Sequence, residues 1–96
     1  MNFKINDIVK VKENLEVGIY DGLGFPYEML VFRGLKFIVR YTTFHPYYVL
    51  EPIPRKRYPK GVRSEIQWYY FNDAMLEDPI TVILGDFLRK EVKCTK

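Results

Sequence analysis

Positive charge is concentrated in one short segment of this 96-residue chain. Residues 55–63 contain no acid and hold five cations and a tyrosine, namely Arg55, Lys56, Arg57, Tyr58, Lys60 and Arg63. Cations at this density can hold phosphate groups or an acidic protein surface. A solvated loop would have the same composition, so both interpretations stand. Mutual repulsion among the cations slightly favours binding, because a negatively charged partner would relieve it.

Side chains that commonly catalyse reactions are few and scattered. His45 is the single histidine and precedes a proline, so we interpret it as a turn residue and expect no metal site. Ser64 is the single serine and lacks the glycine-flanked setting of a hydrolase nucleophile. Residues 22–24 lack the third glycine of a dinucleotide-binding fingerprint. The sequence therefore predicts a non-enzyme without cofactor or metal.

The composition favours a small β-rich domain. Aromatic residues make up 17% of the chain and hydrophobic residues 48%. Aromatic side chains suit pleated, half-buried surfaces, and 96 residues leave room for one hydrophobic core. We expect a single domain over residues 1–96.

Cysteine usage and charge indicate the setting and the partner classes. Cys94 is the single cysteine, so an internal disulfide is impossible and a reducing compartment is favoured. The first residues lack the apolar core of a signal peptide, and no stretch approaches the roughly 20 apolar residues of a membrane span. We expect a cytoplasmic protein without membrane contact. The net charge of +3 permits nucleic acid or an acidic protein as partner.

Period-two alternation and turn residues predict five short strands with interposed loops. The expected strands are 7–12, 35–42, 47–50, 66–71 and 80–84. Phe37, Val39 and Tyr41 should share one face of the second strand. A short helix is expected at 26–34, with Met29 and Phe32 facing the core, and a single helical turn at 74–77. The remaining segments are a long loop at 13–24 and the basic insert at 52–63. This order suggests a small, closed or nearly closed barrel.

The same residues resemble a known family. Residues 5–15 are similar to the opening strand of small SH3-like barrel proteins of bacteriophages and prophages of Gram-positive bacteria, with Asn6 in place of the usual glycine. The Leu-x-Val-Gly-x-Tyr loop of that family matches residues 15–20, and its helix-ending Met and closing Gly match Met29 and Gly34. Its aromatic strand and helical turn resemble residues 68–77. The resemblance covers about residues 5–78. The insert at 52–63 and the extension at 79–96 depart from the pattern.

The resemblance implies an SH3-like barrel and a binding function. Such barrels bind peptides between the long first loop and the helical turn, in grooves lined by aromatic rings. Tyr20, Trp68 and Tyr70 could supply these rings, as could Tyr47 or Tyr48, although core packing is the commoner fate of a tyrosine. Phage-encoded modules of this size often act on host proteins, including inhibition of defence nucleases such as CRISPR effectors.

Two functions are therefore expected from the sequence. The first is a protein-interaction module, present as a monomer or a weak homodimer. The second is a nucleic-acid-binding barrel that places the cations of residues 55–63 on phosphates and exposed aromatic rings on bases.

Overall fold

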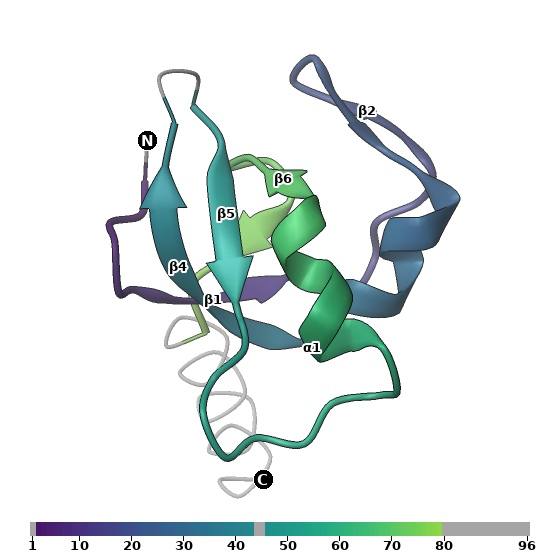
Figure 1. The fold of residues 1–96 in the computed structure, drawn as a ribbon. Helices are drawn as coiled ribbons and strands as arrows, with labels where there is room; N and C mark the ends of the chain where they lie inside the picture. The colour runs from purple at the N-terminus through teal and green to yellow at the C-terminus, as the bar shows by residue number, and fades with distance from the viewer. Residues whose placement is uncertain (1, 44–45, 80–96) are drawn as a thin grey trace, which may run out of the picture.

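A computed structural model of the chain describes residues 2–43 and 46–79. These residues form seven short strands and three short helices (Figure 1). The strands are β1 (Ile8–Val11), β2 (Gly18–Tyr20), β3 (Leu23–Phe25), β4 (Lys36–Thr42), β5 (Tyr48–Glu51), β6 (Tyr70–Phe71) and β7 (Leu76–Glu77). The helices are η1 (Tyr27–Phe32), α1 (Val62–Glu65) and η2 (Ile66–Trp68), of which η1 and η2 are 3₁₀-helices. The predicted β-rich class is confirmed.

Five strands form one antiparallel sheet, in the order β6-β5-β4-β1-β7. The longest strand, β4, pairs with β1 through Val9 and Phe37 and with β5 through Val39 and Leu50. The last described strand, β7, pairs with the first, β1, through Val11 and Leu76. Among the described residues β6 and β7 are the two edges and do not pair with each other, so the sheet is not the closed barrel that the strand pattern suggested.

The core lies on one face of this sheet. Alternate side chains of β1 and of the first half of β4 are fully buried there, as period two requires, and β5 adds the buried side chains of Tyr48 and Leu50. The 3₁₀-helix η1 covers part of this face with Met29 and Phe32, which confirms the predicted core side of the helix. The Phe32 ring contacts those of Phe37, Tyr69 and Phe71 with centroids 5.5–6.1 Å apart.

Glycine ends η1 in the expected place. Gly34 has a φ of +76°, a backbone conformation that disfavours side chains. A Cβ atom at this position would lie 3.0 Å from Cγ of Glu13. The backbone N–H of Gly34 donates to the carbonyl of Val11 at 2.7 Å, and this hydrogen bond joins the end of η1 to β1.

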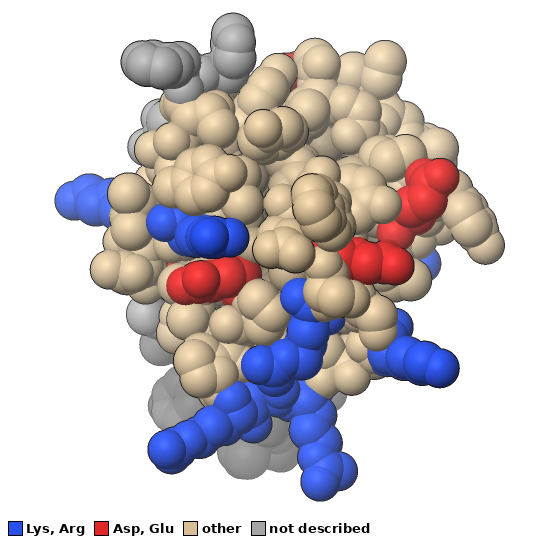
Figure 2. Space-filling view, in the orientation of Figure 1, with Lys and Arg blue, Asp and Glu red and all other residues tan. Residues whose placement is uncertain are grey.

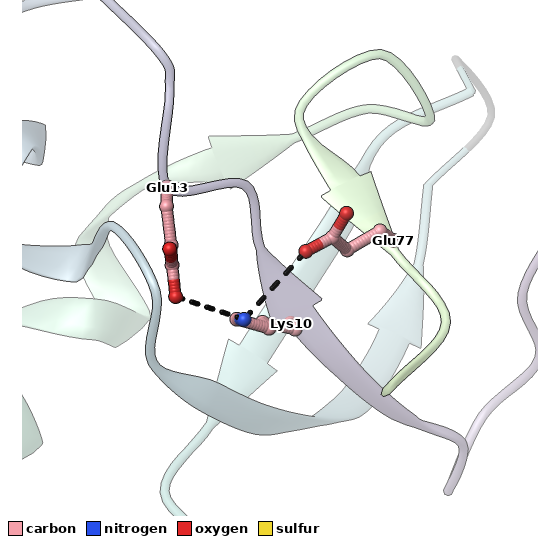
Figure 3. Close-up of polar contacts among 3 residues, drawn as sticks. All are labelled: Lys10, Glu13 and Glu77. Atoms are coloured by element: carbon pink, nitrogen blue, oxygen red, sulfur yellow. Dashed lines mark ion pairs between the residues drawn. The ribbon is translucent and has the colours of Figure 1, made fainter. Parts of the chain in front are cut away.

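One lysine of β1 connects the start of the long loop to the edge strand β7 (Figure 3). Lys10 on β1 places its ammonium group 2.9 Å from a carboxylate oxygen of Glu13 and 3.8 Å from one of Glu77 on β7. The Lys10 side chain is 13% exposed, whereas that of Glu13 is 71% exposed. Exposed ion pairs contribute little stability, so this group chiefly fixes where the loop leaves β1.

The hairpin β2–β3 occupies residues 18–25, most of the second half of the loop expected at 13–24, and stands apart from the main sheet in Figure 1. Phe25 at its end is buried, and Tyr20 packs edge-on against it with ring centroids 6.2 Å apart. The amide of Asn72 donates to the carbonyl of Tyr20 at 2.7 Å. This hydrogen bond links the hairpin to the turn between β6 and β7.

The predicted strand at 66–71 is largely wrong. Its first half is the 3₁₀-helix η2, which continues α1, and only Tyr70 and Phe71 are in a strand. Val62 and Ile66 are both buried and lie four residues apart, which is the helical spacing that brings two side chains to one face. The aromatic composition of 66–71 favoured a strand, but this apolar pair decides the local structure.

Two further expectations need correction. Tyr41 was placed on the same face as Phe37 and Val39, yet it is 44% exposed. A register shift between Val39 and Tyr41 in the pairing with β5 accounts for this, because one extra residue reverses which face a side chain occupies. The helical turn predicted at 74–77 is a hydrogen-bonded turn that passes into strand β7 at Leu76.

Several predictions lie outside the described residues. These are the strand at 80–84, the turn role of His45 and the position of Cys94. Within residues 2–43 and 46–79 no helix has the length and apolar character needed to cross a lipid bilayer.

Candidate functional site

The basic loop, residues 55–63, follows β5 and leads into α1. Tyr58 fixes its path. The Tyr58 ring stacks on that of Phe37 with centroids 5.3 Å apart and planes inclined by 10°. Its hydroxyl accepts a hydrogen bond from the backbone N–H of Ile53 at 2.8 Å and donates one to the carbonyl of Lys36 at 2.9 Å. The loop is therefore attached to β4 by a side chain near its middle.

Arg63 provides a second attachment within the loop. Its guanidinium carbon lies 5.9 Å from the centroid of the Tyr58 ring, and its Nη1 donates to the carbonyl of Lys56 at 3.1 Å. A guanidinium over an aromatic face is attracted by the negative potential of the ring. Tyr58 and Arg63 were predicted to contact a partner, and the structure shows that both also hold the loop together.

All five cations of the loop are exposed, including Arg63. Among the described residues no carboxylate lies within ion-pair distance of Arg55, Lys56, Arg57 or Lys60. Figure 2 shows Lys and Arg side chains gathered over this loop at the lower end of the face, with the visible acids above them. The structure thus places uncompensated positive charge on a braced loop.

The second candidate surface is aromatic. Trp68 at the end of η2 is 75% exposed, and Tyr70 on β6 is 49% exposed. The residue between them, Tyr69, has extended backbone and packs its ring against Phe32. Trp68 and Tyr70 are therefore exposed on either side of a residue whose ring packs into the core. The ring of Tyr47 lies 6.1 Å from that of Tyr70. We call Tyr47, Trp68 and Tyr70 the aromatic patch.

The other two aromatic candidates serve the fold. Tyr20 is half-buried, and its hydroxyl accepts from the backbone N–H of Glu16 and donates to the carbonyl of the same residue, both at 2.9 Å. Tyr48 is fully buried in β5. The structure therefore brings the predicted residues into two groups, the basic loop and the aromatic patch, and leaves Tyr20 and Tyr48 outside both.

Sequence reasoning missed the role of Asn72. This side chain is 3% exposed, and while its amide nitrogen donates to Tyr20, its buried oxygen has no hydrogen-bond partner among the described residues. Asn72 also begins a turn, in which the backbone N–H of Met75 donates to its carbonyl. Nothing in the local sequence indicates that the Asn72 side chain reaches a loop 52 residues away.

A hollow of about 570 Å³ lies beside β1 and the start of the basic loop. Its walls combine apolar side chains with both signs of charge, and the described residues in them are Asn2, Phe3, Asn6, Asp7, Ile8, Lys36, Ile53, Lys56, Asp78 and Pro79. Only Lys56 belongs to the predicted site. Within the described ranges, no three His, Cys, Asp or Glu side chains converge as metal ligands would.

Comparisons with models of known families, with curated proteins and with solved structures found no match. What the protein does must therefore be inferred from its own side chains.

Proposed function

We propose that this chain is a non-catalytic protein-binding module and that the aromatic patch is its main contact surface. The observation that carries the proposal is the exposure of Trp68, which leaves three quarters of the largest apolar side chain in water. Tryptophan and tyrosine are enriched among the residues that contribute most to binding energy at protein interfaces. Their rigid rings bury much area and lose little conformational entropy on binding.

The position of the patch also supports binding. Tyr69 and Phe71 pack into the core on either side of Tyr70, so the backbone that presents the patch is anchored. A partner would meet rings that are already in place, which lowers the entropic cost of association.

An SH3-like arrangement is part of the proposal. The first strand lies between β4 and β7, a long loop with its own hairpin follows β1, and a single turn joins β6 to β7. These features agree with the resemblance noted in the sequence. That resemblance makes a bacterial host protein, including a defence nuclease such as a CRISPR effector, the partner class to screen first.

The test is a pull-down from bacterial lysates with the tagged chain and two variants. Trp68→Ala combined with Tyr70→Ala should remove the captured protein. Tyr27→Ala is the matched control, because Tyr27 is 76% exposed and lies on η1, outside the patch. The captured protein is then purified and its affinity measured directly. Equal affinity for the wild type and the double variant would refute the aromatic patch as the contact surface.

Nucleic-acid binding is the second candidate. The exposed cations of the basic loop together with exposed Trp68 favour it, because cations contact phosphates and rings stack on bases. Affinity for a mixed oligonucleotide should then fall steeply with salt, by about 0.7 powers of ten per phosphate contacted for each tenfold rise in salt concentration. A gel-shift series at low salt without any complex at micromolar protein would exclude it.

A further inference from the structure

We propose that the basic loop is a preformed docking site for a short acidic segment of the protein partner, separate from the aromatic patch. This inference rests on the proposed function, because it takes the partner to be a protein. The loop is the second candidate surface of the molecule, and of its five cations only Arg63 has a contact through its charged group with the rest of the loop.

The loop is ordered by contacts that leave its cations outside. Tyr58 is held by Phe37, Ile53 and Lys36, and Arg63 closes the loop onto Lys56. Pro54 and Pro59 fix two further backbone angles. The shape of the loop is therefore largely fixed before any partner binds, so little entropy is lost on docking.

Backbone strain occurs within the same loop. Arg55 has a φ of +68°, in the left-handed region that side chains other than Asn, Asp and Gly rarely occupy. Strained residues of this kind persist where the surroundings hold them and cluster at binding sites. The strained residue, Arg55, is itself one of the exposed cations.

The spacing of charge favours an acidic peptide over a nucleic acid. The exposed cations lie within the nine residues 55–63, and the nearest acids in the sequence, Glu51 and Glu65, stand on either side. A nucleic-acid backbone is a continuous line of negative charge and needs a long positive track. A segment with two to four carboxylates fits a short cluster of cations, and arginine can pair with a carboxylate through two hydrogen bonds.

The probe is a fluorescein-labelled peptide of about 12 residues that alternates Glu pairs with Gly-Ser, compared with its Gln analogue by fluorescence polarisation at about 0.15 M salt, where charges act over about 8 Å. The test variant combines Arg55→Ala, Arg57→Ala and Lys60→Ala. The control combines Lys4→Ala, Lys12→Ala and Arg40→Ala, which lowers the net charge by the same three units, from +3 to 0, outside the loop. Circular dichroism checks that each variant is folded.

We expect the wild type to bind the Glu peptide and not the Gln peptide. The loop variant should lose about tenfold or more in affinity, whereas the control should lose about twofold or less, since only close charges act strongly in salt. Tyr58→Phe keeps every cation and the ring stack but loses both hydroxyl hydrogen bonds. It should weaken binding a few-fold without changing the salt dependence, because the number of charges contacted stays the same.

Three results would overturn this inference. The first is failure of the wild type to bind the Glu peptide. The second is an equal loss in the loop variant and the control, which would mean general charge attraction. The third is tighter binding of a thymidine 12-mer than of the Glu peptide, which would assign the loop to nucleic acid. If the partner is still captured through Trp68 and Tyr70, the proposed function survives each of these results.

Discussion

The hydroxyl of buried Tyr48 joins three parts of the chain. It accepts a hydrogen bond from the backbone N–H of Phe3 at 3.1 Å and donates one to a carboxylate oxygen of Asp73 at 2.5 Å. The same carboxylate oxygen accepts from the backbone N–H of Asn2 at 3.1 Å. One side chain of β5 thereby holds the N-terminal segment against the turn before β7.

The Tyr48→Phe variant tests this arrangement at constant ring packing. It should destabilise the fold by about 1–2 kcal/mol, because the hydrogen bonds of a hydroxyl are lost and a carboxylate keeps one partner fewer. Urea denaturation followed by circular dichroism measures the change. Tyr27→Phe, which alters an exposed ring, should leave stability within about 0.5 kcal/mol.

The Tyr48→Phe variant also tests how the stability of the fold depends on pH. Burial first, and then the hydrogen bond to Asp73, raises the pKa of Tyr48 above its usual value of 10.0. A raised pKa means that the fold favours the protonated hydroxyl, so this stabilisation is complete below pH 10 and is lost as pH rises through the raised pKa. The stability gap between the wild type and Tyr48→Phe should narrow above that pH. A stability difference between the wild type and Tyr48→Phe that stays constant from neutral to strongly alkaline pH would contradict the raised pKa of Tyr48.

Residue roles in the basic loop show what composition can and cannot predict. The concentration of charge was evident in the sequence and is present on the surface. All five cations of the loop are exposed, but which of them also contacts the loop was not predictable, because Arg63 depends on the position of the Tyr58 ring. Tyr58 in turn depends on the carbonyl of Lys36, 22 residues away on another strand. Contacts of this kind are set by the tertiary fold.

At the scale of elements, predictions succeeded where several residues repeat a pattern. Strands β1, β4 and β5 and the core side of η1 follow apolar spacings that extend over several residues. Strand β7 has two residues and therefore no periodicity, so its sequence resembles the end of a turn. The helical stretch α1–η2 was missed because the bulky aromatic residues of 66–71 outweighed the spacing of Val62 and Ile66.

The hairpin β2–β3 gives a prediction at this scale. Its link to the β6–β7 turn is the hydrogen bond from the Asn72 amide to the carbonyl of Tyr20. In the Asn72→Ala variant we expect amide hydrogen exchange to accelerate in residues 18–25, because a buried acceptor loses its partner. Exchange in β4 and β5 should change much less. Asn14→Ala, in an exposed turn, is the control and should leave the hairpin unaffected. Uniform acceleration across the whole sheet would show that Asn72 supports the entire fold instead of the hairpin.

At the scale of the whole molecule, the aromatic patch and the basic loop are formed by different segments of the chain. Aromatic rings that complete the core and rings that face solvent alternate from Trp68 to Phe71, while the cluster of five cations at 55–63 lies outside the sheet. The mainly β class was predictable because composition and alternation agree over most of the described chain. The absence of pairing between β6 and β7 among the described residues was not predictable, since it depends on how far these two short edge strands lie apart.

The core itself depends on one ring that connects three elements. Phe32 is fully buried and brings η1 into contact with β4 through Phe37 and with the end of the sheet through Tyr69 and Phe71. Phe32→Ala should cost about 3–5 kcal/mol, through lost transfer free energy and the cavity that remains. A domain of this size is stable by about 5–15 kcal/mol, so the variant should unfold at a much lower urea concentration than the wild type.

The neighbouring Val31 provides the control for this last prediction. It lies on the same 3₁₀-helix and is 52% exposed, so Val31→Ala should change stability by about 0.5 kcal/mol or less. Equal effects of the two substitutions would mean that η1 is not held by its buried ring. If Phe32→Ala instead accelerates hydrogen exchange in residues 27–32 alone, η1 detaches locally while the sheet stays folded. A large loss of stability with one cooperative transition, followed by circular dichroism and Trp68 fluorescence together, would establish that η1 and the sheet share a single core.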